Sequence, residues 1–75
     1  MIEETFENLS DNDLEFLINE IYKVEKQDKE VSETMMLNNL INTLDDAELL
    51  PEGLEFTNTC MLCMREYSYR KAGLK

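Results

Sequence analysis

The residues best suited to chemistry in this chain are two thiols, Cys60 and Cys63, in the stretch TCMLCMREYSYRK near the C-terminal end. A Cys-x-x-Cys spacing can hold a metal ion or form a redox pair. A structural zinc site needs four ligands, however, and the chain has two cysteines and no histidine. Zinc binding would therefore need two chains, each of which contributes one cysteine pair across a dimer.

The same two cysteines also fit the core of a helical protein. Residues at positions i and i+3 share one face of a helix, and this face would also carry Met64 and Tyr67, with Met61 near its edge. A thioredoxin-type redox pair follows a strand, and no strand is predicted before Cys60. Free cysteine is among the most buried residue types. We interpret the pair as core and expect no cofactor, with zinc shared across a dimer as the alternative.

The composition predicts one small helical domain over residues 1–75. Seventy-five residues are near the lower limit for a chain that folds alone. The hydrophobic fraction of 43% is typical of a globular protein. Two glycines and one proline are few chain breakers, which favours helices over a β architecture with many turns.

We expect an all-α, three-helix domain. Ser10 and Ser32 are suitable N-caps for the first two helices, and Gly73 is a suitable residue to follow the third. A short extra helical turn is expected near residues 46–50, ahead of Pro51, because Asp45 with Glu48 resembles a capping box. The three helices are expected to cover residues 11–27, 32–45 and 58–72.

The charge favours a basic partner. Seventeen acidic and seven basic residues give a formal net charge of −10, which repels nucleic acid and anionic membrane surfaces. Between Glu30 and Met64 there is no lysine or arginine. The acidic residues of this stretch can simply be a solvated face, can steer a basic protein surface towards the chain, or can mimic a nucleic-acid backbone. The candidate binding acids are Asp45, Asp46, Glu48, Glu52 and Glu55.

A few large apolar residues are predicted to project away from the stripe that their own helix should bury. Aromatic residues and methionine are enriched in the cores of protein interfaces, so we expect these side chains to contact a partner or a second copy. The alternative is that the N-terminal segment covers them through Ile2 and Phe6. The candidate partner-binding residues are Phe16, Met35, Leu62 and Tyr69.

Most enzyme classes are disfavoured by the residues that the chain lacks. There is no histidine and no glycine-rich phosphate-binding loop, and a domain this small can hardly enclose a desolvated carboxylate pocket. The acidic N-terminus does not resemble a secretory signal, and no apolar run approaches the length of a membrane span. We therefore expect a cytoplasmic protein that is not an enzyme and contacts neither membrane nor nucleic acid directly.

The leading hypothesis is an acidic protein-binding module that inhibits or regulates a partner with a basic surface. A protein that handles nucleic acid would present such a surface. The alternative hypothesis is a structural helical homodimer, in which the apolar patch is covered by a second copy. In size, acidity and lack of catalytic residues, the chain is similar in type to small bacteriophage-encoded proteins that bind and redirect host machinery.

Overall fold

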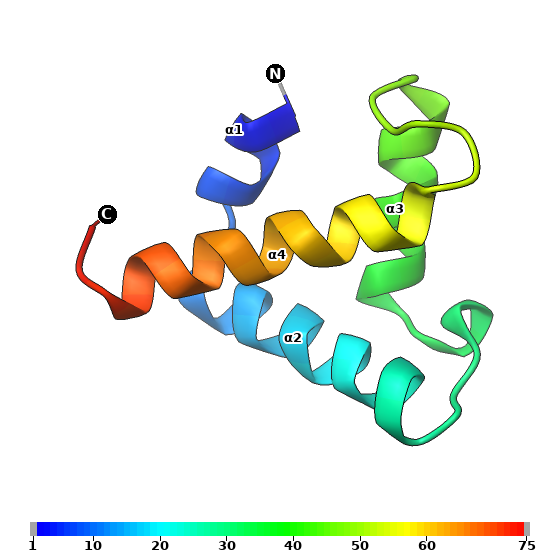
Figure 1. Cartoon of the computed structure of the whole chain (residues 1–75), viewed down its shortest axis with the longest axis horizontal. Helices are drawn as coiled ribbons and strands as arrows, with labels where there is room; N and C mark the ends of the chain where they lie inside the picture. Colours follow the sequence, from blue (N-terminus) through cyan, green and yellow to red (C-terminus); the bar gives the residue numbers. More distant parts are fainter. Residues whose placement is uncertain (1, 75) are drawn as a thin grey trace.

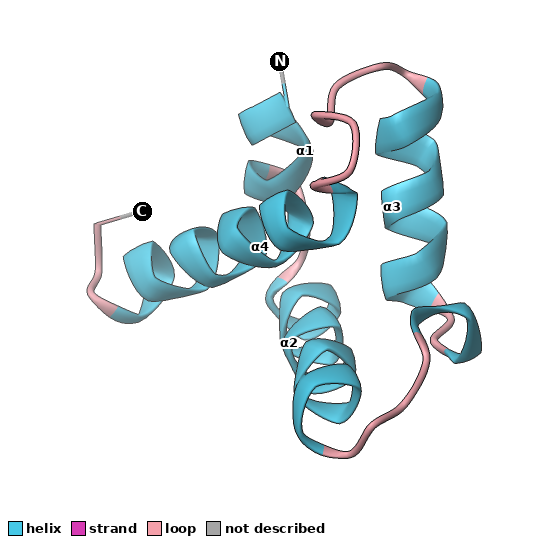
Figure 2. Ribbon diagram, turned by 45° about the vertical axis from the view of Figure 1, so that its right-hand side comes forward, coloured by secondary structure: helices cyan, strands magenta, loops and turns pink. Residues whose placement is uncertain are grey.

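The computed structural model describes residues 2–74 and confirms the all-α prediction. Within these residues the chain forms four α-helices and one 3₁₀ helix, η1, and no strand (Figure 2). The elements are α1 (Ile2–Glu7), α2 (Asp11–Lys26), η1 (Val31–Glu33), α3 (Met36–Asp46) and α4 (Glu55–Lys71).

Helix α4 is the element that joins the others. It crosses in front of α2 in Figure 1, with α1 beside its C-terminal half and α3 beside its N-terminal end, and it packs against all three. The backbone extends over 32 × 28 × 16 Å, so its thinnest dimension corresponds to about two packed layers of helices. So thin a molecule has little interior in which to enclose a cavity.

The start of α2 follows the sequence prediction. Ser10 has an extended backbone, and its side-chain oxygen accepts the Asp13 N–H at 3.1 Å, which satisfies one of the free donors of the first turn. The helix ends at Lys26, one residue before the predicted end. Asp28 then adopts a left-handed conformation with φ 55°, which turns the chain towards η1.

The predicted start of the second helix at residue 32 is wrong. Ser32 lies in η1, and α3 begins four residues later, at Met36. The Thr34 hydroxyl accepts the Asn38 N–H at 3.1 Å, and a carboxylate from α2 binds two further backbone donors. The cap of α3 therefore comes partly from a residue distant in sequence.

The extra helical turn expected near residues 46–50 is also wrong. The Leu49 N–H donates to the Leu44 carbonyl at 3.0 Å and the Glu48 N–H donates to the Asp45 carbonyl at 2.9 Å, which is a Schellman ending. Glu48 takes the left-handed position of this motif, with φ 58°. Asp45 and Glu48 thus terminate α3 instead of forming a capping box for a new turn.

The C-terminal end of α4 is close to the prediction, whereas its start is not. Gly73, with φ 75°, occupies the left-handed position after the helix, and the Leu74 N–H donates to the Tyr69 carbonyl at 2.9 Å. The helix begins at Glu55, three residues before the predicted start, directly after the turn at Gly53.

Helix α1 was not predicted as a helix, and packing of its residues Ile2 and Phe6 was given only as the alternative to a partner interface. Phe6 is 2% exposed and joins residues from α2, α3, the loop before α4 and α4 itself in one core. Helices α2 and α3 each supply three members of this core. The buried apolar residues are Phe6, Leu14, Leu17, Ile21, Leu37, Ile41, Leu44, Leu50 and Cys63.

Candidate functional site

Two of the candidate partner-binding residues, Phe16 and Met35, lie in one shallow groove. The groove is lined by Phe16 from α2 and by Met35, Met36 and Asn39 from the start of α3, with a volume of about 290 Å³. Phe16 is 47% exposed and Met35 is 79% exposed, the highest exposure of any large apolar residue described. The groove is open and mostly apolar, so it can take a hydrophobic side chain.

A buried carboxylate holds the α3 side of this groove in place. Glu20 is 6% exposed, and its two oxygens accept the backbone N–H groups of Met35 at 2.9 Å and Leu37 at 2.7 Å. The free donors and the dipole of a helix N-terminus favour such a negative charge. Glu20 therefore fixes the backbone that carries Met35 against α2. The sequence analysis missed this role because the two segments are fifteen or more residues apart.

The other two candidate residues, Leu62 and Tyr69, lie elsewhere, where α1 packs on α4. They border a pocket of about 120 Å³ together with Phe6, Arg65 and neighbouring acids of α1. Leu62 is half-buried against the core, and Tyr69 is 37% exposed. The alternative interpretation, in which the N-terminal segment covers the off-stripe residues, therefore describes Leu62, whereas Phe16 and Met35 stay open to solvent.

Arg70 ties this second region together. Its guanidinium bonds Glu66 at 2.8 Å and Asp11 at 2.9 Å, and it donates to the carbonyls of Phe6 at 3.1 Å and Glu7 at 3.2 Å. The hydrogen bond to Glu66 is the main reason why the pKa of Arg70 is raised above its ordinary value. Arg70 of α4 thus joins its own helix to α1 and α2.

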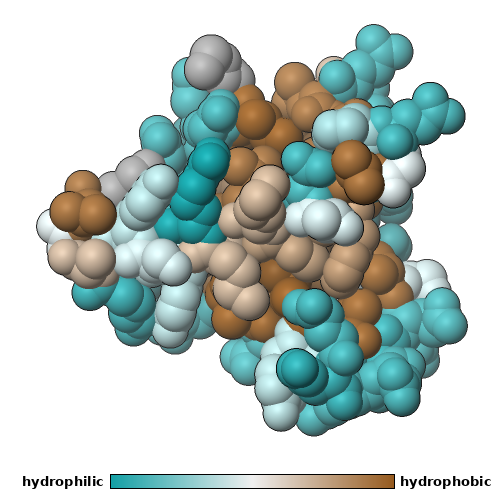
Figure 3. Space-filling view, in the orientation of Figure 1, coloured by the Kyte–Doolittle hydropathy of each residue, from teal (hydrophilic) through white to brown (hydrophobic). Residues whose placement is uncertain are grey.

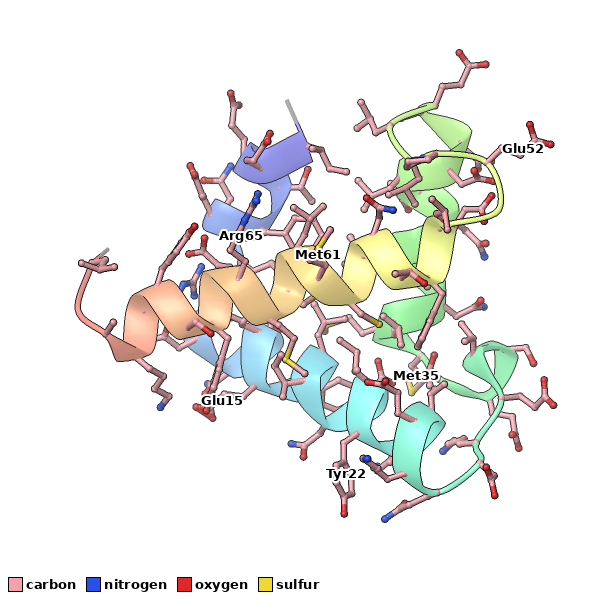
Figure 4. The ribbon with its side chains drawn as sticks, in the orientation of Figure 1. Glu15, Tyr22, Met35, Glu52, Met61 and Arg65 are labelled. Atoms are coloured by element: carbon pink, nitrogen blue, oxygen red, sulfur yellow. The ribbon has the colours of Figure 1, made fainter. Side chains whose placement is uncertain are left out.

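The five candidate acids do not border the groove. They begin at the C-terminal end of α3, whereas Met35 precedes its N-terminal end, and an eleven-residue helix is about 16 Å long. Figure 4 shows the labelled Glu52 and Met35 at opposite ends of α3. Glu55 is half-buried, and its carboxylate accepts the Gly53 N–H at 3.1 Å. The remaining four acids, which are exposed, are Asp45, Asp46, Glu48 and Glu52.

The two cysteines occupy the interior face of α4. Cys63 is fully buried, as predicted for a core residue, and Cys60 is half-buried. Burial raises the pKa of both thiols from 9.0 to about 12, helped at Cys60 by the charge of Glu25 and at Cys63 by Cys60. Thiols with such a pKa are poor nucleophiles at neutral pH. No cluster of three or more potential metal ligands occurs within residues 2–74.

The predicted orientation of α4 is partly wrong. Met64 was expected on the buried stripe, but it is 42% exposed, and Met61 is 55% exposed. Thr59 and Glu66 are buried instead, and Arg70 on the same side of α4 bonds Asp11 of α2 and the carbonyls of Phe6 and Glu7. No periodicity of apolar residues could reveal an inner face that carries a threonine and a carboxylate.

No protein-family model, curated protein or solved structure matches this chain. Among residues 2–74, no helix combines the length and the apolar character that crossing a membrane requires.

Proposed function

We propose that this chain is a non-enzymatic protein-binding module that docks on a partner with a basic surface. The observation that carries the proposal is the open groove of Phe16 and Met35, whose lining is apolar and whose backbone is held by Glu20. Exposed methionine and aromatic side chains are typical of binding surfaces, and the flexible thioether adapts to different partners.

The charge supports a basic partner. The chain carries a formal net charge of −10, and the whole segment from η1 to the middle of α4 lacks lysine and arginine. A field of one sign accelerates the approach of an oppositely charged protein and disfavours acidic ones. Because these acids lie at and beyond the end of α3 that is distant from the groove, they would steer the partner and contact it outside the apolar centre. Occupation of a basic surface that binds nucleic acid would inhibit that partner.

The proposal is tested by binding after the partner has been isolated. A photo-crosslinking residue at position 35 captures the partner, and the purified partner is then titrated with variants. Phe16→Asp and Met35→Asp should each weaken binding at least roughly tenfold, because each places a charge in an apolar contact. Affinity should also fall as the salt concentration rises.

The matched control is Tyr22→Asp. Tyr22 is an aromatic residue of the same helix as Phe16, is 55% exposed, and does not line the groove. It should bind like the unmodified chain, and all variants should keep their helical circular dichroism. If both groove variants bind the partner with unchanged affinity, the proposal is wrong.

A structural homodimer is the second candidate. It is favoured by the exposed methionines of α4, which provide a separate apolar surface that the groove does not include.

A further inference from the structure

The outer face of α4 carries a row of exposed apolar residues. Leu54 directly before the helix is 50% exposed, Met61 is 55% exposed and Met64 is 42% exposed. Their spacing of seven and three residues places them on one side of a helix, with exposed Thr57 and Ser68 in the same row. These five residues are called the α4 ridge below.

The α4 ridge runs along one face of the molecule. In Figure 3, tan and brown atoms extend along the middle of this face, where α4 crosses it, and teal atoms gather towards the margins. Figure 4 shows the labelled Met61 over the middle of α4, with Arg65 about one turn further along. The apolar residues are therefore accessible along much of the helix.

The charge of α4 differs from that of the other helices. From Phe56 to Leu74 the only acid is Glu66, which is 5% exposed and bonded to Arg70. Arg65 and Lys71 are exposed on this helix. Two copies with a formal net charge of −10 each repel one another, and the α4 ridge is a surface on which they can meet without opposing carboxylates.

We infer that the α4 ridge is a self-association surface, on which the ridges of two copies pack antiparallel about a two-fold axis. Self-complementary pairing through one patch is the commonest form of protein dimer. The midpoint of α4 lies at Cys63, so a dyad there brings Met61 of one copy level with Met64 of the second copy, within about 1.5 Å along the axis. The methionines then form the centre of the contact.

The antiparallel arrangement is also complementary in charge. The end of each α4 that begins at Glu55, with Glu52 in the loop before it, lies beside the end of the other α4 that carries Lys71. Antiparallel helices further oppose their dipoles. A parallel pair would instead place like charges together at both ends.

The size of the contact predicts a reversible dimer. A standard stable interface buries about 800 Å² on each partner. That area is roughly one sixth of the 5110 Å² that the whole chain exposes, and a row along one helix offers less. The pairing uses a different surface from the groove of Phe16 and Met35 and does not depend on it.

The inference is tested by sedimentation velocity over a range of protein concentrations, measured at low and at high sodium chloride concentration. The unmodified chain should form dimers, and the dissociation constant should decrease as salt rises, because screening reduces the long-range repulsion between the two acidic copies. The affinity for a basic partner should change in the opposite direction and fall as salt rises. A chain that stays monomeric at every concentration and salt level overturns the inference, as does a dimer that weakens with salt.

Variants locate the surface. Met61→Glu and Met64→Glu should each raise the dissociation constant at least roughly tenfold, since each introduces a carboxylate at the centre of the contact. Met35→Glu is the matched control, because Met35 is a more exposed methionine outside the ridge. If Met35→Glu disrupts the dimer and the ridge variants do not, the α4 ridge is not the interface. Circular dichroism verifies that all three variants remain folded.

A charge exchange tests the antiparallel direction. Lys71→Glu should weaken the dimer several-fold at low salt, and adding Glu52→Lys to it should restore the affinity of the unmodified chain, because exposed ion pairs contribute up to about 1 kcal/mol each. A double variant that is no tighter than Lys71→Glu alone would reject this pairing of the two ends.

Discussion

The Glu20 carboxylate of α2 lies 2.7 Å from the backbone nitrogen of Leu37 and accepts its N–H, so one helix supplies the N-terminal cap of another. A second oxygen of the same carboxylate accepts the Met35 N–H at 2.9 Å. This contact couples the stability of the fold to the groove, because the capped turn of α3 carries the exposed Met35.

Glu20→Gln should lower the free energy of unfolding by about 1–2 kcal/mol. The amide keeps the shape of the side chain, but its nitrogen cannot accept a hydrogen bond, so one backbone donor of α3 loses its acceptor. Urea denaturation followed by circular dichroism measures the change. Glu15→Gln, on an exposed position of the same helix, should alter stability by less than about 0.5 kcal/mol. Equal stability of the two variants would contradict the capping role.

Arg70→Ala should destabilise the fold by about 2–4 kcal/mol, because the change removes an ion pair with a buried carboxylate. The Glu66 side chain is 6% exposed in that pair, and the same guanidinium holds two carbonyls of the α1 segment. Exchange of amide hydrogens should therefore speed up first in α1, measured by mass spectrometry. Arg65→Ala is the control for loss of a basic residue of α4, since Arg65 is exposed. If Arg70→Ala lowers the free energy of unfolding no more than Arg65→Ala does, the contacts of Arg70 do not hold the helices together.

The thiols of α4 should make stability fall as the pH rises from 9 to 12. In the folded chain burial raises the pKa of Cys60 and Cys63 to about 12, from the value of 9.0 expected when the chain is unfolded. Between these values the unfolded state loses thiol protons that the folded state keeps, so the free energy of unfolding decreases with pH. Well below pH 9 both states keep the thiol protons, and the thiols contribute no slope.

The measurement is urea denaturation at several pH values under reducing conditions. A chain with both Cys60→Ala and Cys63→Ala should show a shallower decline above pH 9 than the unmodified chain. The comparison uses the slope of the free energy of unfolding against pH. The two substitutions change stability by an amount that does not depend on pH, and the tyrosines and lysines are the same in both chains, so neither affects the difference between the slopes. Parallel slopes would mean that the thiols ionise as easily in the folded state as in the unfolded state.

The parts of the fold that local patterns determine could be predicted from the sequence. The Ser10 cap and the period of Leu14, Leu17 and Ile21 define α2, and Gly73 defines the end of α4, because these signals act within one turn of the chain. The start of α3 could not be predicted in this way, since the part of its cap that Glu20 supplies lies on another helix.

The candidate site was predictable only in part, for the same reason. An off-stripe position is a local property, and it identified Phe16 and Met35, which the fold brings into one groove. The sequence does not show that α1 covers Leu62, or that Glu66 is buried beside Arg70 while Met61 is exposed. Those outcomes depend on contacts between residues more than fifty positions apart, such as Arg70 with Phe6.

Thr59→Val should stabilise the chain by about 1 kcal/mol, which is unusual for a substitution in a core. The Thr59 side chain is fully buried, and its hydroxyl has no hydrogen-bond partner among the described residues. Valine has nearly the same shape and a similar helix propensity, so the change removes the cost of desolvating the hydroxyl and leaves the packing intact.

Thermal unfolding should show this gain as a rise in Tm of roughly 4–8 °C, the scale for a domain of this length. Thr43→Val is the control, because Thr43 is exposed on α3 outside the α4 ridge, and water can replace the hydrogen bond that its hydroxyl donates to the Asn39 carbonyl. A lower Tm for Thr59→Val would mean that the hydroxyl donates to a backbone carbonyl of α4. In that case the inner face of the helix would depend on this hydrogen bond, together with the ion pair of Glu66 and Arg70.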